Sequence, residues 1–214
     1  MRTIATVVLA LSMLTACASI PGQSKNPEDW LGQGVSLLKA QQYEEAITAF
    51  SAAIELDPRY AEAYYNRGLA RTNKGDFDAA ISDFSSVIGL NPGYAEAYYR
   101  RGLAWIEKGE LDAAISDFSS VLKFNPDNAE AYYNRGLARL SKGAFDQAVS
   151  DFTKVLELNP GYTEAYYNRG LAWAEKGELQ QGLNDAEKAL RLEPENKALI
   201  PLPRINFFPN PQLS

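Results

Sequence analysis

AEAYYNRGLARTNKGDFDAAISDFSSVIGLNPGY, residues 61–94, is the segment that decides the fold. Near copies begin again at Ala95, Ala129 and Thr163, and a more divergent copy occupies residues 27–60. Two residue types keep the step of 34 along the chain: Gly34, Gly68, Gly102, Gly136 and Gly170, and Pro58, Pro92, Pro126, Pro160 and Pro194. A fixed period of this length is typical of a solenoid, in which each unit buries its apolar face only by stacking on its neighbours.

Each copy is predicted to form two helices joined by a short turn. In the copy at 61–94 the helical patterns cover about 61–73 and 78–90, with Gly75 in the turn between them. Pro92 ends the second helix, because proline lacks an amide proton and disfavours a helical residue before it. Asn26, followed by a proline and two acids, has the composition of a helix start.

The repeated residues resemble the tetratricopeptide repeat, which has an aromatic residue at position 4, Gly at 8, Ala at 20, an aromatic at 24 and Pro at 32. In two of the copies these are Tyr64, Gly68, Ala80, Phe84 and Pro92, and Trp30, Gly34, Ala46, Phe50 and Pro58. The resemblance implies an all-α, right-handed solenoid of five repeats at residues 27–60, 61–94, 95–128, 129–162 and 163–196. The fifth copy has a polar second helix with Gly182 and Ala186 at positions 20 and 24, as expected of a cap.

Positions 7 and 23 depart from the family pattern by carrying charges that occur together. The first copy lacks both, with Gln33 and Ala49 there, so the simplest interpretation is an ion pair between the two helices of a repeat. The predicted pairs are Arg67 with Asp83, Arg101 with Asp117, Arg135 with Asp151, and Arg169 with Asp185. The serine pairs at 85–86 and 119–120 are expected on a solvated outer surface.

Position 11 also departs from the family pattern, because it alternates between arginine and tryptophan in copies two to five. The residues are Arg71, Trp105, Arg139 and Trp173. Stacking of a guanidinium on a neighbouring indole and duplication of a pair of repeats both explain the alternation.

The composition favours no enzyme and predicts neither a cofactor nor a metal site. The 214 residues include no histidine, which removes the commonest metal ligand and proton-transfer group, and no phosphate-binding glycine loop is recognisable. The single cysteine, Cys17, excludes an internal disulfide framework. A net charge of −6 argues against nucleic acid as a partner.

Residues 1–16 have the pattern of a secretory signal, with Arg2 near the start, an apolar run and small residues at the end. Residues 14–17, Leu-Thr-Ala-Cys, resemble the bacterial lipobox, which implies cleavage before Cys17 and acylation of that cysteine. Residues 17–26 are interpreted as a flexible, lipid-anchored tether. Ala18 after the cysteine implies, by the same resemblance, an outer-membrane lipoprotein in the bacterial envelope, facing the periplasm. An ordinary signal peptide or a short anchor is the alternative.

Family resemblance implies that the first helices of the repeats line a concave, peptide-binding groove. Its predicted side chains, at positions 5, 6 and 9, are Tyr65, Asn66, Leu69, Tyr99, Arg100, Leu103, Tyr133, Asn134, Leu137, Tyr167, Asn168 and Leu171. In each Tyr-Tyr pair the first ring is expected to serve the core and the second to face the groove. The asparagines are expected to pair with the backbone of an extended peptide. Duplication or packing alone is the competing explanation of the identical residues.

The carboxylate clamp of chaperone-binding relatives is matched only by Asn66 and Arg100, and position 2 is always glutamate. A neutral or basic segment is therefore the expected ligand. The sequence thus predicts a membrane-anchored adaptor that binds extended or helical segments of other proteins. A pilotin-like assembly factor for a secretin or pilus, and a self-associating structural array, are the alternatives. The apolar, proline-rich tail at 197–214 is expected to dock on the last repeat or in a groove.

Overall fold

The computed structural model describes residues 26–194, and within that range the chain forms ten helices and no strand. The helices are α2 (Pro27–Lys39), α3 (Tyr43–Leu56), α4 (Ala61–Lys74), α5 (Phe77–Leu90), α6 (Ala95–Glu107), α7 (Leu111–Phe124), α8 (Ala129–Ser141), α9 (Phe145–Leu158), α10 (Thr163–Glu175) and α11 (Leu179–Leu192). The predicted signal, Cys17, nearly all of the tether and the tail at 197–214 lie outside the described residues.

Local sequence signals set the helix ends. The Asn26 side chain accepts from the Asp29 amide at 2.8 Å, and the Asp29 carboxylate accepts from the Asn26 amide at 3.2 Å, so a reciprocal cap starts α2. Gly75 closes the turn between α4 and α5 with φ of +83°, a left-handed conformation that suits glycine. The predicted helices at 61–73 and 78–90 agree with α4 and α5 to within one residue at each end.

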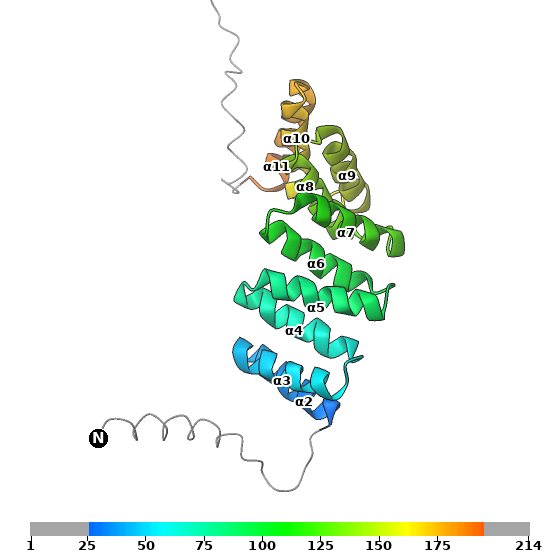
Figure 1. Cartoon of the computed structure of the whole chain (residues 1–214). Helices are drawn as coiled ribbons and strands as arrows, with labels where there is room; N and C mark the ends of the chain where they lie inside the picture. Colours follow the sequence, from blue (N-terminus) through cyan, green and yellow to red (C-terminus); the bar gives the residue numbers. More distant parts are fainter. Residues whose placement is uncertain (1–25, 195–214) are drawn as a thin grey trace, which may run out of the picture.

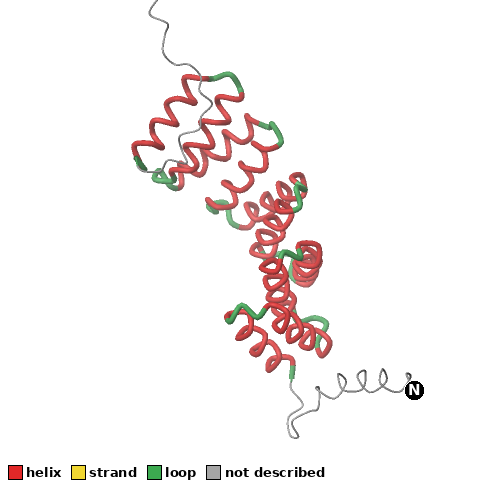
Figure 2. The backbone as a smooth tube through the Cα atoms, turned by 90° about the vertical axis from the view of Figure 1, so that its left-hand side faces the viewer, coloured by secondary structure: helices red, strands yellow, loops and turns green. Residues whose placement is uncertain are grey.

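The helix pairs stack in chain order into an elongated solenoid (Figure 1). We call the first helix of each repeat the A helix (α2, α4, α6, α8, α10) and the second the B helix (α3, α5, α7, α9, α11). Every A helix after α2 packs against both its own B helix and the preceding one, and successive A helices also touch each other. The A helices therefore lie on the inner side of the winding array, whose successive pairs turn relative to one another (Figure 2).

Buried phenylalanines facing glycines hold each of the first four helix pairs together. Phe50, Phe84, Phe118 and Phe152 are all 0% exposed. A Cβ at Gly102 would lie 2.8 Å from Cε1 of Phe118, so only glycine lets the ring lie against the A helix. In the fifth repeat Ala186 stands in place of the phenylalanine, and the backbones of the two helices lie closer together. A Cβ at Gly182 would lie 2.9 Å from the Gly170 carbonyl oxygen.

The first repeat closes the N-terminal end of the array. In later repeats, A-helix positions 3 and 10 are fully or almost fully buried alanines, such as Ala63 and Ala70. The first repeat instead has exposed Asp29 and Ser36 there. A further repeat could not pack on this face without removing the Asp29 carboxylate and the Ser36 hydroxyl from water. Head-to-tail stacking of copies onto α2 is therefore disfavoured.

Candidate functional site

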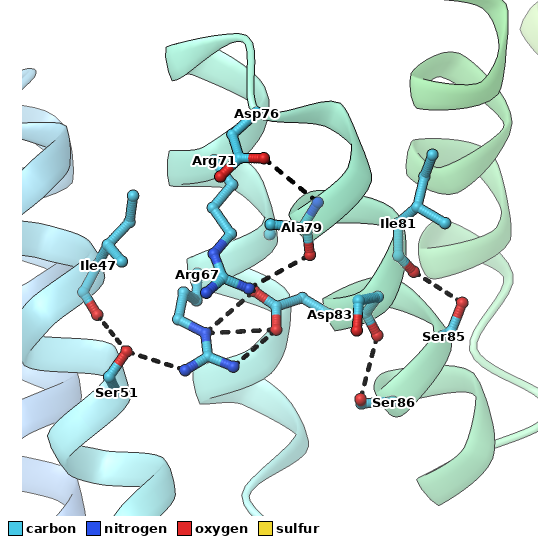
Figure 3. Close-up of polar contacts among 12 residues, drawn as sticks. Ile47, Ser51, Arg67, Arg71, Asp76, Ala79, Ile81, Asp83, Ser85 and Ser86 are labelled. Carbon is cyan, nitrogen blue, oxygen red and sulfur yellow. Dashed lines mark hydrogen bonds and ion pairs between the residues drawn. The ribbon is translucent and has the colours of Figure 1, made fainter. Parts of the chain in front are cut away.

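Each of repeats two to five contains a buried ion pair between its A and B helices. Arg67 reaches Asp83 in this way, as Figure 3 shows. The predicted pairs of positions 7 and 23 all form, with nitrogen–oxygen distances between 2.7 and 3.3 Å. The four aspartates are 2–7% exposed. These acids therefore join the two helices of each repeat.

The same arginines also bond to a serine or threonine of the preceding repeat, and two of these residues, Ser85 and Ser119, were expected on a solvated surface. That interpretation was wrong for the first serine of each pair. Arg101 Nη1 donates to Ser85 Oγ at 2.8 Å, and Ser85 in turn donates to the Ile81 carbonyl. The other contacts are Arg67 with Ser51, Arg135 with Ser119, and Arg169 with Thr153.

The alternation at position 11 places a second arginine on the aspartates of repeats two and four. Arg71 Nη1 lies 2.8 Å from Asp83 Oδ2, so two guanidinium groups share that one carboxylate (Figure 3). Arg139 makes the same contact with Asp151. In repeats three and five the tryptophan is covered by a lysine of its own helix, with Lys176 Nζ 4.5 Å from the Trp173 ring centre. Of the two explanations for the alternation, stacking of an arginine on the indole is thus not observed, because a lysine lies over each of these two rings.

A second set of ion pairs joins neighbouring repeats at the surface. Lys108 pairs with Asp78 of the preceding repeat, and Lys142 pairs with Asp112 in the same manner. The aspartates of these pairs are 80–85% exposed, so each contributes little to stability. They connect position 14 of one repeat to position 18 of the repeat before it.

The predicted binding side chains lie together on one surface. We define the A-helix face as positions 2, 5, 6 and 9 of α4, α6, α8 and α10. Its tyrosines, asparagines and leucines are all partly buried, whereas its glutamates are exposed. The glutamates are Glu62, Glu96, Glu130 and Glu164. The only base on this face is Arg100, which is paired with Glu96 at 2.8 Å.

The first tyrosine of each pair packs against a core cluster, as expected, and the second tyrosine contacts the core as well. The first ring, such as Tyr98, lies beside the guanidinium of Arg101, 5.7 Å from ring centre to Cζ. The second ring, such as Tyr99, packs against the buried Phe118 with 5.8 Å between ring centres. The second tyrosine therefore contacts the core phenylalanine, and its hydroxyl extends to the A-helix face.

Hydrogen bonds link the tyrosines of one repeat to position 6 of the next. Asn134 Nδ2 donates to the Tyr99 hydroxyl at 3.0 Å and to the Glu130 carbonyl at 2.9 Å. Asn168 bonds to the Tyr133 hydroxyl and to the Glu164 carbonyl in the same way. Both amide protons of these two asparagines are used, so toward a peptide they offer only their Oδ1 as an acceptor.

Three tyrosines of the face, Tyr65, Tyr99 and Tyr133, remain protonated hydrogen-bond donors at neutral pH. Burial, followed by the charge of neighbouring glutamates, raises the pKa of Tyr65, Tyr99 and Tyr133 above the ordinary value of 10.0. The A-helix face is therefore aromatic, negatively charged and able to donate through its hydroxyl groups.

Position 34 supplies tyrosines that the sequence interpretation did not include. Tyr94 meets Tyr65 edge to face, with 5.6 Å between ring centres. Tyr162 stacks on Tyr133 at 5.0 Å and donates its hydroxyl to the Glu130 carboxylate. The sequence did contain a signal for them. Tyr94 and Tyr162 are two periods apart, and Tyr60 occupies the same position 34 in the first repeat.

No helix between residues 26 and 194 is long and apolar enough to cross a membrane. In the same range, no three acidic, histidine or cysteine side chains come together as metal ligands would.

The stacked helix pairs and the side chains of the A-helix face define a helical-repeat interaction scaffold. Sequence models described as tetratricopeptide repeat match residues 61–94, 129–162 and 163–196, and a related TPR repeat model matches 34–75 and 104–143. The chain therefore belongs to the tetratricopeptide repeat family. A comparison with curated protein sequences finds no significant match.

Several solved structures share the fold. One structure of MamA is 30% identical, with a TM-score of 0.76 over 82% of this chain and 96% of MamA. YrrB, described as a TPR protein with an unusual peptide-binding site, is 24% identical, with a TM-score of 0.74 over 80% of this chain and 88% of YrrB. MamA from Desulfovibrio magneticus RS-1 is 22% identical, with a TM-score of 0.76 over 82% of this chain and 99% of that chain.

Proposed function

We propose that this protein is an adaptor of the bacterial envelope, anchored through Cys17, that binds extended segments of other proteins on its A-helix face. One observation carries the proposal. The hydroxyl groups of Tyr99 and Tyr133 are joined to the asparagines of the next repeat, which makes a continuous aromatic and polar strip across repeat boundaries. Such a strip can follow a peptide over several residues.

Charge and hydrogen-bonding capacity favour a neutral or basic segment as the ligand. The position-2 glutamates are exposed along the strip, and Arg100 is already paired with Glu96. The amides of Asn134 and Asn168 present acceptor oxygens, which suit the backbone N–H groups of an extended chain. An acidic segment would place its charges beside these carboxylates and would be repelled. The one base on the face, Arg100, is already paired and could compensate little of that charge. The peptide-binding site named for YrrB, on the same fold, is consistent with this proposal.

Photo-crosslinking in living cells tests the binding face. A photoreactive phenylalanine at Tyr99 or Tyr133 is expected to capture a partner protein, because both positions lie on the strip. The same group at Ser116 or Ser150, which are exposed on the B helices α7 and α9, is expected to capture little. The readout is the pattern of crosslinked bands, followed by mass spectrometry of each band.

Two outcomes would contradict the proposed binding face. One is the capture of the same proteins with equal yield from Tyr99 and from Ser116. The other is a pattern that survives replacement of Glu130 and Glu164 by lysine, because reversing these charges should repel a basic segment. Melting curves of the charge-reversed variant show whether it is still folded. The exposure of both glutamates predicts that it is.

Anchoring is tested separately at Cys17. Cys17→Ser is expected to abolish incorporation of an alkyne-tagged palmitate and to move the protein from the membrane pellet to the soluble fraction. Each buried methylene of an acyl chain contributes about 0.8 kcal/mol, so loss of several chains should release the protein completely. A serine variant that still sediments with membranes would mean that something other than acylation holds the protein there.

A further inference from the structure

A pocket on the A-helix face lies within repeat two. It has a volume of about 410 Å³ and is lined by Glu62, Tyr65 and Asn66 of α4, by Val87 of α5, and by Tyr94 in the following connection. The rings of Tyr65 and Tyr94 meet at 76°, which leaves two aromatic surfaces at the sides. Val87 is 1% exposed and contributes an apolar wall. The pocket is thus apolar along its sides and has a carboxylate among its lining residues.

The Glu62 carboxylate has no partner of its own among residues 26–194. It accepts no hydrogen bond and forms no ion pair there, although its backbone carbonyl accepts from Asn66. The equivalent carboxylates of the next two repeats are both occupied. Glu96 is paired with Arg100, and Glu130 accepts from the Tyr162 hydroxyl. Glu62 therefore differs from these equivalents in being available to a ligand.

The aromatic walls also distinguish this pocket from its equivalents. In repeat three the residue equivalent to Tyr94 is Asn128, so one ring is absent. In repeat four the rings of Tyr133 and Tyr162 are nearly parallel, at 27°, and lie against each other. Near-identical repeats thus produce one place where two rings stand apart at a steep angle beside an unpaired carboxylate.

We propose that this pocket binds a lysine or arginine side chain of the segment held on the A-helix face. The methylene stem would pack against Tyr65, Tyr94 and Val87, and the cationic group would pair with Glu62. Aromatic faces attract cations, and long basic side chains commonly bury their stems while the charge stays at the surface. Arg100 adjoins Tyr65, but its charge is compensated by Glu96. The proposal rests on the A-helix face being the binding surface and names the side chain that it selects.

Small probes test the pocket without knowledge of the partner. The full chain carrying Cys17→Ser is titrated with N-acetyl-lysine methylamide and with the norleucine analogue, which has the same stem but no amine. The lysine probe is expected to shift the amide signals of Glu62, Tyr65 and Tyr94 in ¹H–¹⁵N spectra. It should bind roughly fivefold more tightly than the norleucine probe, from one ion pair and one cation–π contact.

The matched variants are Glu62→Gln and Glu130→Gln. Glu62→Gln should remove the preference for lysine over norleucine, whereas Glu130→Gln should retain it, because Glu130 is occupied by Tyr162. Equal binding of the two probes, or an equal effect of the two substitutions, would overturn the pocket assignment. If Tyr99 and Tyr133 capture a partner but the lysine probe does not bind, the binding face stands and the pocket is wrong. If the probe binds but nothing is captured, the pocket stands and the adaptor role fails.

Discussion

Asp117→Ala is expected to lower the free energy of unfolding by roughly 3 kcal/mol, because it removes the partner of a largely buried guanidinium. Asp117 accepts from Arg101 Nε and Nη2, both at 2.8 Å, and is 4% exposed. Once Asp117 is gone, Arg101 keeps its hydrogen bond to Ser85 but has no opposite charge beside it. Urea unfolding of the Cys17→Ser background, followed by circular dichroism, measures the change.

Asp112→Ala is the matched control for Asp117→Ala. It removes an ion-paired aspartate from the same helix, but this carboxylate is 85% exposed and pairs with Lys142 at the surface. Asp112→Ala should therefore lower the free energy of unfolding much less than Asp117→Ala does. The double variant Arg101→Met with Asp117→Leu should regain most of the stability lost in Asp117→Ala, because it leaves no buried charge. If the double variant is as unstable as Asp117→Ala, lost packing rather than the orphaned charge is the cause.

Gly102→Ala is expected to destabilise the protein by about 1–3 kcal/mol, although alanine is the better helix former. The new Cβ would lie 2.8 Å from Cε1 of Phe118, a ring that is fully buried and cannot move aside without disturbing its neighbours. Thermal and urea unfolding are the measurements. In a Phe118→Leu background, Gly102→Ala should lower the free energy of unfolding by less, because the two positions are in direct contact.

Gly89→Ala makes the same chemical change as Gly102→Ala, but it is expected to raise the stability of the protein. Gly89 is exposed within α5, and nothing lies within 4 Å of its added Cβ. Alanine there should stabilise the protein by about 0.4–1 kcal/mol, by restricting the unfolded chain and favouring the helix. Destabilisation by both substitutions would show that Phe118 is not what excludes a side chain at Gly102.

The repeat architecture could be predicted because its signals are local. Glycine and proline recur at a fixed step, and the helical pattern stops at each Asn-Pro or Asp-Pro. The bonds of Arg67 with Asp83 and of its equivalents could also be predicted, because both charges are missing together from the first repeat. Such observations need no knowledge of how one repeat is placed on the next.

Several contacts that escaped prediction join different repeats. Ser85 bonds to Arg101, Asp78 to Lys108 and Tyr99 to Asn134, at separations of 16, 30 and 35 residues. Which positions meet across a boundary depends on the rotation and shift between stacked repeats, and periodicity alone does not specify these. The pocket at Glu62 lies within one repeat, and it was missed because the predicted face included only A-helix positions, whereas Tyr94 follows the B helix of that repeat.

The shared arginines have a consequence for how such a chain can change over generations. Each arginine bonds to an aspartate of its own repeat and to a hydroxyl of the previous repeat, and Ser85 and Ser119 occupy equivalent positions. Loss of one period, residues 95–128, would therefore bring Ser85 opposite Arg135 and recreate the same contact. Unequal recombination among the segments that encode repeats two to five can therefore lengthen or shorten the array by whole repeats and keep this arginine–hydroxyl contact at each new junction.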